Sequence, residues 1–293
     1  MQQAEVLVIK LIEHKNEVEI IGLSDFDTER IFECGQCFRW NRRDDGSYIG
    51  IAMGKAARLR YESKDAENEN MRIFISGSLL DFENIWRTYF DIDRDYAKIR
   101  AQLRISPFMQ KATSYGKGIR ILRQDTWEAL CSFIISQCNN IQRIKNIISV
   151  LCREFGDVIV FEQQELYTFP SAERLASLSV VDLAPLRCGY RAEYIISAAQ
   201  DVTSNRVRLD ELHHLEPDMA KAELKKIQGV GDKVADCVAL FGLNMLDSFP
   251  LDVWMKRALK EHFAKDFDPA VFSPYAGIAQ QYIFYYIRSL GSR

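Results

Sequence analysis

The chain has 293 residues, and its 38 lysine and arginine residues against 41 aspartate and glutamate residues give a formal net charge of -3. Hydrophobic residues make up 47% and charged residues 27%, which excludes a disordered or collagen-like chain and predicts a soluble globular protein. No apolar run approaches the roughly 20 residues that span a bilayer, so we expect no membrane partner and a cytoplasmic location. At about 150 residues per domain, the length predicts two domains.

Charge and cysteine content bound the function classes further. An acidic net charge is unusual for a protein that binds nucleic acid, although it does not exclude a local basic face. The seven cysteines, spread from Cys34 to Cys237, are typical of free thiols in a reducing compartment. Cys34 and Cys37 form a Cys-x-x-Cys pair with no second pair at zinc spacing, which leaves a zinc or redox role as a minor alternative. The C-terminal part lacks the four closely spaced cysteines of an iron–sulfur cluster.

The first part of the chain, to about residue 104, alternates apolar and polar residues in short runs that predict strands. Residues 37–51 predict a hairpin, because a polar turn at Asp44-Asp45-Gly46-Ser47 separates two such runs. We expect an α+β layer in which an antiparallel sheet carries helices on one face. The other elements predicted here are strands at 17–21 and 72–75 and helices at 80–89 and 94–103.

The pattern then changes to the helical period, and we expect an all-α second domain. We place the boundary near residue 110, which gives an α+β domain over residues 1–110 and a helical domain over residues 111–293. The predicted helices cover residues 126–138, 141–155, 172–177, 191–203, 219–227, 233–241, 253–262 and 276–289.

Residues 224–237 carry the most informative motif, Leu-Lys-Lys-Ile-Gln-Gly-Val-Gly-Asp-Lys-Val-Ala-Asp-Cys. A helix ending at Gly229, a tight turn through Gly231 and a new helix from Asp232 would direct unpaired backbone N–H groups outward. Such a helix-hairpin-helix holds a DNA backbone through main-chain amides and therefore needs few lysines. An ordinary helix–helix turn remains the alternative.

Lys233 and Asp252 are the candidate reactive residues. Lys233 lies in the first turn of its predicted helix, where the helix dipole favours the neutral, nucleophilic amine. Asp252, nineteen residues later, precedes an apolar-periodic segment and suits a helix N-cap whose carboxylate also faces the hairpin. Taken alone, each residue is better explained by its ordinary role, Lys233 as a solvated surface lysine and Asp252 as a plain helix cap.

Together these residues resemble the 8-oxoguanine DNA glycosylases of the helix-hairpin-helix superfamily, in which Gly-Val-Gly-x-Lys-Val-Ala-Asp-Cys is followed by Pro-x-Asp. The resemblance implies a TATA-binding-protein-like N-terminal sheet domain ahead of the helical glycosylase domain, and it favours the bacterial branch. Matching motifs lie in the family's order and cover nearly the whole chain, at residues 35–40, 118–125, 132–134, 138–144, 189–194, 229–237, 250–252 and 274–284.

The resemblance implies a base-excision repair enzyme acting on double-stranded DNA that contains 8-oxoguanine, preferably opposite cytosine. Lys233 is then the nucleophile that attacks the sugar C1′ and forms a Schiff base, after which β-elimination nicks the strand. Asp252 is implied to stabilise the positive charge that develops on the sugar. We expect a monomer that needs no cofactor and no catalytic metal, with a structural monovalent cation at the carbonyls of Lys225, Ile227 and Val230.

The resemblance also implies a pocket for the flipped base. The backbone carbonyl of Gly35 would accept from the N7–H that distinguishes oxidised guanine from guanine. Cys237 and Phe284 would enclose the base from two sides, and Gln280 would bond its Watson–Crick edge. Without the resemblance, Gly35 would be a turn glycine, and Cys237 and Phe284 would be core residues.

Four further residues are implied to hold the DNA around the vacated space, together with Gly229 and Gly231 of the hairpin. Arg143 and Arg191 would grip the unpaired cytosine, Tyr190 would stack as a wedge, and Asn139 would help to fill the gap. Surface salt bridges and a half-buried tyrosine are the alternatives. The sequence departs from eukaryotic members at Cys138, which replaces an asparagine, and at Trp254, which replaces a phosphate-binding histidine; the indole of Trp254 donates only once.

Two other functions compete with this interpretation. A helix-hairpin-helix glycosylase for alkylated bases acts by water attack, and Lys233 argues against it because those enzymes lack the hairpin lysine. A non-enzymatic DNA-binding module would use the hairpin alone. It would leave the set of Gly35, Cys237, Gln280 and Phe284 without a common purpose.

Overall fold

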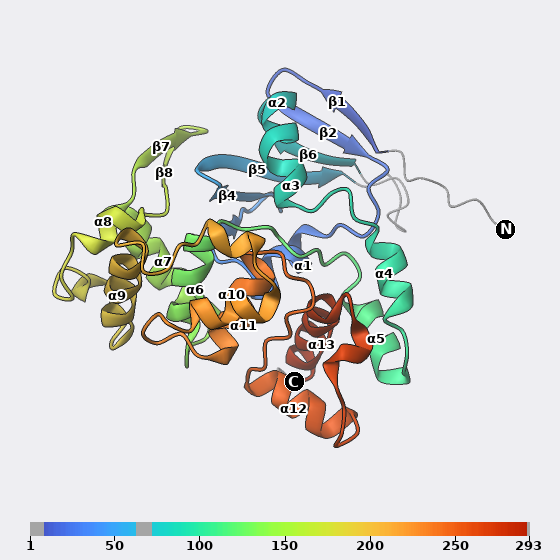
Figure 1. The fold of residues 1–293 in the computed structure, drawn as a ribbon. Helices are drawn as coiled ribbons and strands as arrows, with labels where there is room; N and C mark the ends of the chain where they lie inside the picture. Colours follow the sequence, from blue (N-terminus) through green and yellow to red (C-terminus); the bar gives the residue numbers. More distant parts are fainter. Residues whose placement is uncertain (1–8, 63–71, 292–293) are drawn as a thin grey trace.

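The computed structural model describes residues 9–62 and 72–291, so the remaining residues of the predicted domains lie outside it. Its first part contains a six-stranded antiparallel sheet in the order β1-β2-β6-β5-β4-β3, which confirms the expected α+β layer. Figure 1 shows this sheet at one end of the molecule and the helical part at the other. The strands are β1 (Lys10–Glu13), β2 (Glu17–Ile21), β3 (Trp40–Arg42), β4 (Tyr48–Ala52), β5 (Lys55–Glu62) and β6 (Arg72–Ser76).

The predicted hairpin is confirmed as β3 paired with β4, with Trp40 opposite Gly50. Its turn closes because Asp45 accepts hydrogen bonds from the Ser47 backbone N–H and hydroxyl. Helix α1 (Thr28–Glu33) lies between the sheet and the helical part (Figure 1). The predicted helix at 80–89 is α2 (Leu79–Asp81), a π-helical turn (Phe82–Trp86) and α3 (Arg87–Tyr89), joined end to end. These elements bring the chain back toward the helices.

The second part is helical, as expected. The ends predicted for residues 141–155, 191–203 and 253–262 are confirmed, while α5 was not predicted; residue 110 lies inside it. Each helix in the described residues is too short or too polar to cross a membrane. The helices are α4 (Tyr96–Gln102), α5 (Pro107–Tyr115), α6 (Thr126–Ser136), α7 (Ile141–Phe155), α8 (Ala172–Ala176), α9 (Arg191–Thr203), α10 (Pro217–Leu224), α11 (Asp232–Phe241), α12 (Val253–His262) and α13 (Ala276–Gly291).

One strand pair interrupts the helices and corrects the expectation of an all-helical second part. Strands β7 (Val158–Phe161) and β8 (Gln164–Tyr167) form a hairpin that leans against the sheet, where Glu162 accepts from Arg43 and Arg58. Its turn residues Glu162 and Gln163 have φ values of 47° and 61°. Because neither residue is glycine or asparagine, the sequence lacks the residues that usually mark a tight β-hairpin turn.

The two hydrophobic cores exchange residues across the division of the chain. Leu122 packs in the core beneath the sheet, whereas Cys34 and Phe38 belong to the helical core. Arg120, only 1% exposed, donates to the backbone carbonyls of Asp25 and Asp91 at 2.9 and 2.7 Å. This interlocking fixes where the loop after α1 meets the helices. The division into residues 1–110 and 111–293 stays a prediction.

Candidate active site

The loop that follows α1 carries Gly35, and buried hydrogen bonds fix it from one side. The side chain of Gln36, fully buried, donates to the carbonyls of Ile31 and Arg120 at 3.0 and 2.8 Å. Its amide oxygen accepts from the Leu122 N–H at 2.9 Å, and its own backbone carbonyl accepts from Gln124 at 2.7 Å. Gln36 therefore ties this loop to the segment that enters the helical part.

Helix α13 fixes the same loop from the other side. The Gln281 side chain donates to the carbonyl of Cys34 at 2.8 Å. Gly35 has a φ of +85°, and a Cβ atom placed on it would lie 3.1 Å from Ile141 and 3.4 Å from the Phe284 ring. The Gly35 backbone therefore lies beside the Phe284 ring, which is consistent with the predicted base pocket.

The helix-hairpin-helix lies between α10 and α11, and the predicted end of the first helix at Gly229 is wrong. α10 ends at Leu224, because the following N–H groups of Lys226 and Ile227 bond three residues back. Gly229 has a φ of +82°, and a Cβ atom there would overlap the Tyr194 ring at 2.2 Å. Nothing lies within 4 Å of the same atom built on Gly231.

The backbone of this hairpin offers unpaired donors. Gly231 is the N-cap of α11, and the helical ladder begins only where Ala235 N–H bonds the Gly231 carbonyl. The N–H groups of residues 232–234 precede that ladder and have no intrahelical partner. Together with the open space at Gly231, they form the expected surface for a phosphate group.

Lys233 is half-buried in the first turn of α11 and reaches across to α6. Its Nζ donates to the hydroxyl of Ser136 at 2.9 Å and lies 5.4 Å from the centre of the Phe133 ring. The predicted helix 126–138 ends early, at Ser136, so this serine lies at the helix end. Sequence reasoning missed Ser136, since nothing local in the sequence marks a contact across 97 residues.

Cys237, one turn beyond Lys233, is 3% exposed. Burial raises the pKa of its thiol to about 11. Lys233 opposes this with a smaller lowering of the pKa, and Asp252 adds a small further increase. The thiol is therefore neutral at pH 7 and presents a polarisable, uncharged surface.

Asp252 is the N-cap of α12, as predicted, and its Oδ1 accepts from the Met255 N–H at 2.8 Å. Two residues earlier, the carbonyl of Pro250 accepts from the Gln280 side chain at 3.3 Å. Gln280 is 4% exposed, and its amide oxygen is buried without a hydrogen-bond partner among the described residues. An unpartnered buried acceptor is unusual and suits a ligand that donates hydrogen bonds.

Three separate sets of contacts hold the predicted site residues in place. Lys233 contacts Ser136 at the end of α6, and Ile141 at the start of α7 contacts Gly35. Gly35 contacts Phe284 of α13, which also carries Gln280 against the loop before Asp252. Gly35 and Phe284 are thus brought together from segments more than 200 residues apart.

A second cluster contains the residues predicted to hold the opposite strand. Arg191 is 5% exposed and donates to the carbonyls of Gln137, Cys138 and Cys188. Its guanidinium lies 4.5 Å from the centre of the Tyr190 ring, which is 50% exposed. Arg191 therefore braces the loop between α6 and α7, a use that sequence reasoning did not foresee.

Arg143 and Asn139 flank the same loop. Arg143 is exposed and donates to the Arg187 carbonyl at 3.2 Å. The Asn139 side chain donates to the Ile135 carbonyl at 3.2 Å and so closes the end of α6. Cys138, which directly precedes Asn139, is exposed and has a φ of 48°. The cluster presents Tyr190, Cys138 and Arg143 outward.

Two further predictions concern Trp254 and the carbonyls proposed to bind a cation. The Trp254 ring lies against Gly291 at the end of α13, since a Cβ on Gly291 would lie 2.6 Å from it. The carbonyls of Lys225, Ile227 and Val230 lie in the hairpin loop after α10. That of Ile227 accepts from the Val230 N–H at 3.1 Å, and a monovalent cation at these three carbonyls stays a prediction.

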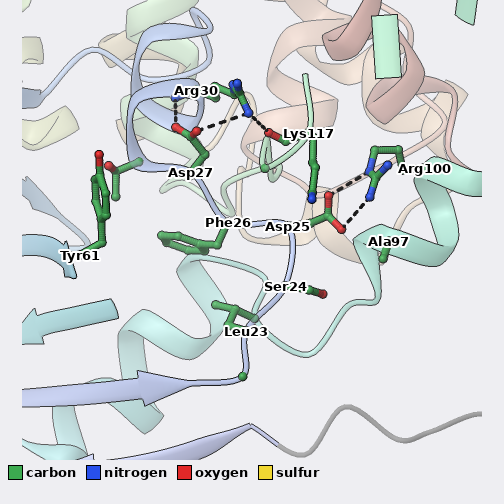
Figure 2. A pocket seen from close by; sticks show the side chains of 13 residues that line it. Leu23, Ser24, Asp25, Phe26, Asp27, Arg30, Tyr61, Ala97, Arg100 and Lys117 are labelled. Carbon is green, nitrogen blue, oxygen red and sulfur yellow. Dashed lines mark hydrogen bonds and ion pairs between the residues drawn. The ribbon is translucent and has the colours of Figure 1, made fainter. Parts of the chain in front are cut away.

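A cavity of about 440 Å³ lies apart from this site, at the other end of α1 (Figure 2). It is bordered by the Asp25–Arg100 and Asp27–Arg30 ion pairs, in which the N···O distances are 2.9 and 3.4 Å. Because α1 has six residues, about 9 Å of helix separates its two ends. The reactive residues do not line this cavity.

Comparison with known proteins gives consistent results. Residues 20–130 match the model of the 8-oxoguanine DNA glycosylase N-terminal domain, and residues 131–270 match that of the HhH-GPD superfamily base excision DNA repair proteins. The N-glycosylase/DNA lyase of Saccharomyces cerevisiae is 30% identical over 262 residues, covering 83% of this chain and 70% of the relative.

Two solved structures resemble the whole chain. MBOgg1, in complex with a low-affinity DNA ligand, is 41% identical with a TM-score of 0.91, covering 97% of this chain and 99% of that chain. The 8-oxoguanine glycosylase/lyase of Clostridium acetobutylicum, in complex with double-stranded DNA containing cytosine opposite 8-oxoguanine, is 34% identical with a TM-score of 0.87. That similarity covers 97% of this chain and 98% of the other.

Proposed function

Because this chain belongs to the 8-oxoguanine DNA glycosylase/lyases of the helix-hairpin-helix superfamily, we propose that it excises 8-oxoguanine through a covalent intermediate on Lys233. It is a DNA N-glycosylase and DNA lyase of base excision repair, and DNA is its partner. The covalent route, the choice of base and the preference for cytosine opposite the lesion are the proposal.

The observation that carries the proposal is the position of the Lys233 amine. Its Nζ donates to the Ser136 hydroxyl, and the amine lowers the pKa of the Cys237 thiol, which the Asp252 carboxylate raises. In the proposed reaction the amine lone pair bonds to C1′ while the bond from C1′ to the base breaks, and its electron pair leaves with the base. Asp252 stabilises the positive charge that develops on the sugar.

In the covalent adduct, the bond from C1′ to the sugar ring oxygen then breaks, and the adduct becomes a Schiff base. Loss of a C2′ proton expels the 3′ phosphate, which nicks the strand, and hydrolysis of the imine releases Lys233. The amine therefore serves as nucleophile in excision and as electron sink in cleavage. Besides the protein and the DNA, these steps use one water molecule, which hydrolyses the imine.

Base recognition is proposed to rest on matched donors and acceptors. 8-Oxoguanine carries a proton on N7, so the Gly35 carbonyl accepts from it and repels the N7 lone pair of guanine. The buried, unpartnered amide oxygen of Gln280 supports a second acceptor, for the N–H groups of the Watson–Crick edge. The neutral Cys237 thiol and the Phe284 ring supply the two faces of the pocket.

The opposite strand is proposed to be held by the cluster of Tyr190, Arg143 and Asn139. The exposed guanidinium of Arg143 is suited to the edge of a cytosine, and Arg191 supports it by bracing the loop. The relative from Clostridium acetobutylicum was solved with double-stranded DNA containing cytosine opposite 8-oxoguanine, which supports the preference. We further propose that the protein acts as a monomer.

A single trapping experiment tests the covalent route. A duplex with one 8-oxoguanine opposite cytosine is mixed with the protein and borohydride, and we expect a covalent protein–DNA band. Lys233→Gln should give no band and no base release while still binding the duplex. Lys226→Gln, which changes an exposed lysine of the same hairpin, is the matched control and should behave as wild type.

The outcomes separate the competing functions. A band that persists in Lys233→Gln contradicts the assignment of the nucleophile. Base release without any band in the wild-type protein indicates water attack, as expected for glycosylases of alkylated bases. An equal trapping rate with adenine, guanine or thymine opposite the lesion contradicts the cytosine preference and leaves the covalent route intact.

A further inference from the structure

We propose that Ser136 is a positioning residue for the reaction, because its hydroxyl holds the Lys233 amine in the place from which it attacks C1′. The inference rests on the proposed role of Lys233 and assigns a function to a residue of α6 that is distant in the sequence. Ser136 does not touch the substrate in this proposal. It acts through Lys233.

The direction of the hydrogen bonds is the first argument. The Ser136 hydroxyl donates its one proton to the Phe133 carbonyl at 2.8 Å. It can therefore only accept from Lys233, whose Nζ lies 2.9 Å away. A serine bound in this way fixes an N–H of the amine and leaves the nitrogen lone pair free for the attack.

The second argument is the contrast with other lysines of this chain. Five of them have a carboxylate within ion-pair distance, namely Lys55, Lys145, Lys221, Lys225 and Lys226. Within residues 9–62 and 72–291, Lys233 has no carboxylate at that distance, and a neutral hydroxyl is its partner. A carboxylate would hold the charged, non-nucleophilic ammonium far more strongly than a hydroxyl does.

The third argument is conformational. A lysine side chain has among the largest rotamer freedom of all residues, and reactivity falls steeply when a nucleophile is misplaced by about 1 Å. The Ser136 hydroxyl and the Phe133 ring both belong to the last turn of α6. A rigid helix end thus limits where the amine can lie before substrate arrives.

A plain helix-end serine is the competing explanation, and the chain supplies a matched control for it. Ser177 makes the same bond at the end of α8, from its hydroxyl to the Arg174 carbonyl at 2.8 Å. Ser177 lies outside the reactive site, and its hydroxyl has no lysine as partner among the described residues. Replacing Ser177 removes the same helix-end bond without touching Lys233.

The experiment measures single-turnover excision of 8-oxoguanine and borohydride trapping for wild type, Ser136→Ala, Ser136→Thr and Ser177→Ala. We expect Ser136→Ala to slow both reactions about tenfold, with the enzyme concentration at half-maximal rate unchanged. Ser136→Thr keeps the hydroxyl and should restore the rate to within about threefold of wild type. Ser177→Ala should match wild type.

Two results would overturn the inference. One is a wild-type rate in Ser136→Ala. The other is an equal loss in the Ala and Thr variants together with a lower thermal midpoint, which indicates a structural role. If wild type itself gives no trapped band, the proposed function fails along with the inference; if wild type is trapped and Ser136→Ala is trapped equally fast, only the inference fails.

Discussion

Two glycine turns of this molecule have nearly the same backbone twist and opposite surroundings. Gly35 and Gly229 have φ values of +85° and +82°. The loop of Gly35 is buried and bonded from both sides, by Gln36 and by Gln281. The turn of Gly229 leads within two residues to Gly231, around which the structure leaves open space.

The difference is consistent with what we propose that each turn recognises. Distinguishing 8-oxoguanine from guanine depends on one proton, so a carbonyl that detects it must be fixed to a fraction of an ångström. A phosphate backbone is the same at every position, and exposed N–H groups hold it without such precision. Buried hydrogen bonds therefore fix the Gly35 loop, whereas the turn that leads from Gly229 to Gly231 stays open.

The largest effect on this comparison should come from Gln36→Ala, which removes the bonds that fix the Gly35 loop. Three buried groups lose a partner, at about 1 kcal/mol or more each, so we expect the free energy of unfolding to fall by about 3 kcal/mol. Chemical denaturation measures it. Gln142→Ala, at an exposed position of α7, is the control. If Gln36→Ala lowered the free energy of unfolding no more than this control does, the result would contradict the role of Gln36.

Gly35→Ala should separate recognition from stability. The added methyl group approaches Ile141 and Phe284, and we expect single-turnover excision to fall about 100-fold because the pocket wall moves. Gly46→Ala is the matched control, since Gly46 has a φ of +80° and no atom within 4 Å of the added Cβ. Both variants should lose similar stability, and equal excision rates in both would show that Gly35 forms no pocket wall.

Gly229→Ala should act on folding first. Its methyl group would overlap the Tyr194 ring at a positive φ, and we expect about 2 kcal/mol of lost stability. The readout is again the denaturation midpoint. Tyr194→Ala combined with Gly229→Ala should lose less than the sum of the single variants, and simple additivity would argue against the overlap.

Gly231→Ala should have the smallest effect, and only on DNA binding. The protein itself has room for the methyl group, so stability should stay within about 0.5 kcal/mol of wild type. The approaching phosphate has less room, and we expect affinity for undamaged duplex to fall about fivefold. Fluorescence anisotropy at fixed salt measures this, and unchanged affinity would remove the hairpin from the interface.

The sequence predicts elements best where caps and periodicity agree. Helix α7 begins after Asn140, whose side chain caps it, and its buried isoleucines keep a helical period, so both ends were predicted. The hairpin β7–β8 was missed because Glu162 and Gln163 form its turn without glycine or asparagine. The site residues are predicted from the order of the motifs, which carries no information on contacts.

What the sequence could not supply are contacts between distant segments. The bond from Lys233 to Ser136, the tether of Gln36 to residues 120–124 and the burial of Arg191 all depend on how helices dock. None of these three side chains has a local pattern that separates it from a surface residue. They emerge only when the loops of the first part meet the helices of the second.

The exchange of residues between the two cores has a consequence for how the chain acquires its structure. Leu122 completes the hydrophobic core beneath the sheet, and Arg120 satisfies carbonyls near residues 25 and 91. The sheet therefore cannot finish packing until the segment at 120–124 has left the ribosome. Contacts of such sequence separation slow folding and couple the two parts into one cooperative unit. The base pocket, whose wall lies on this shared loop, exists only once both halves have folded together.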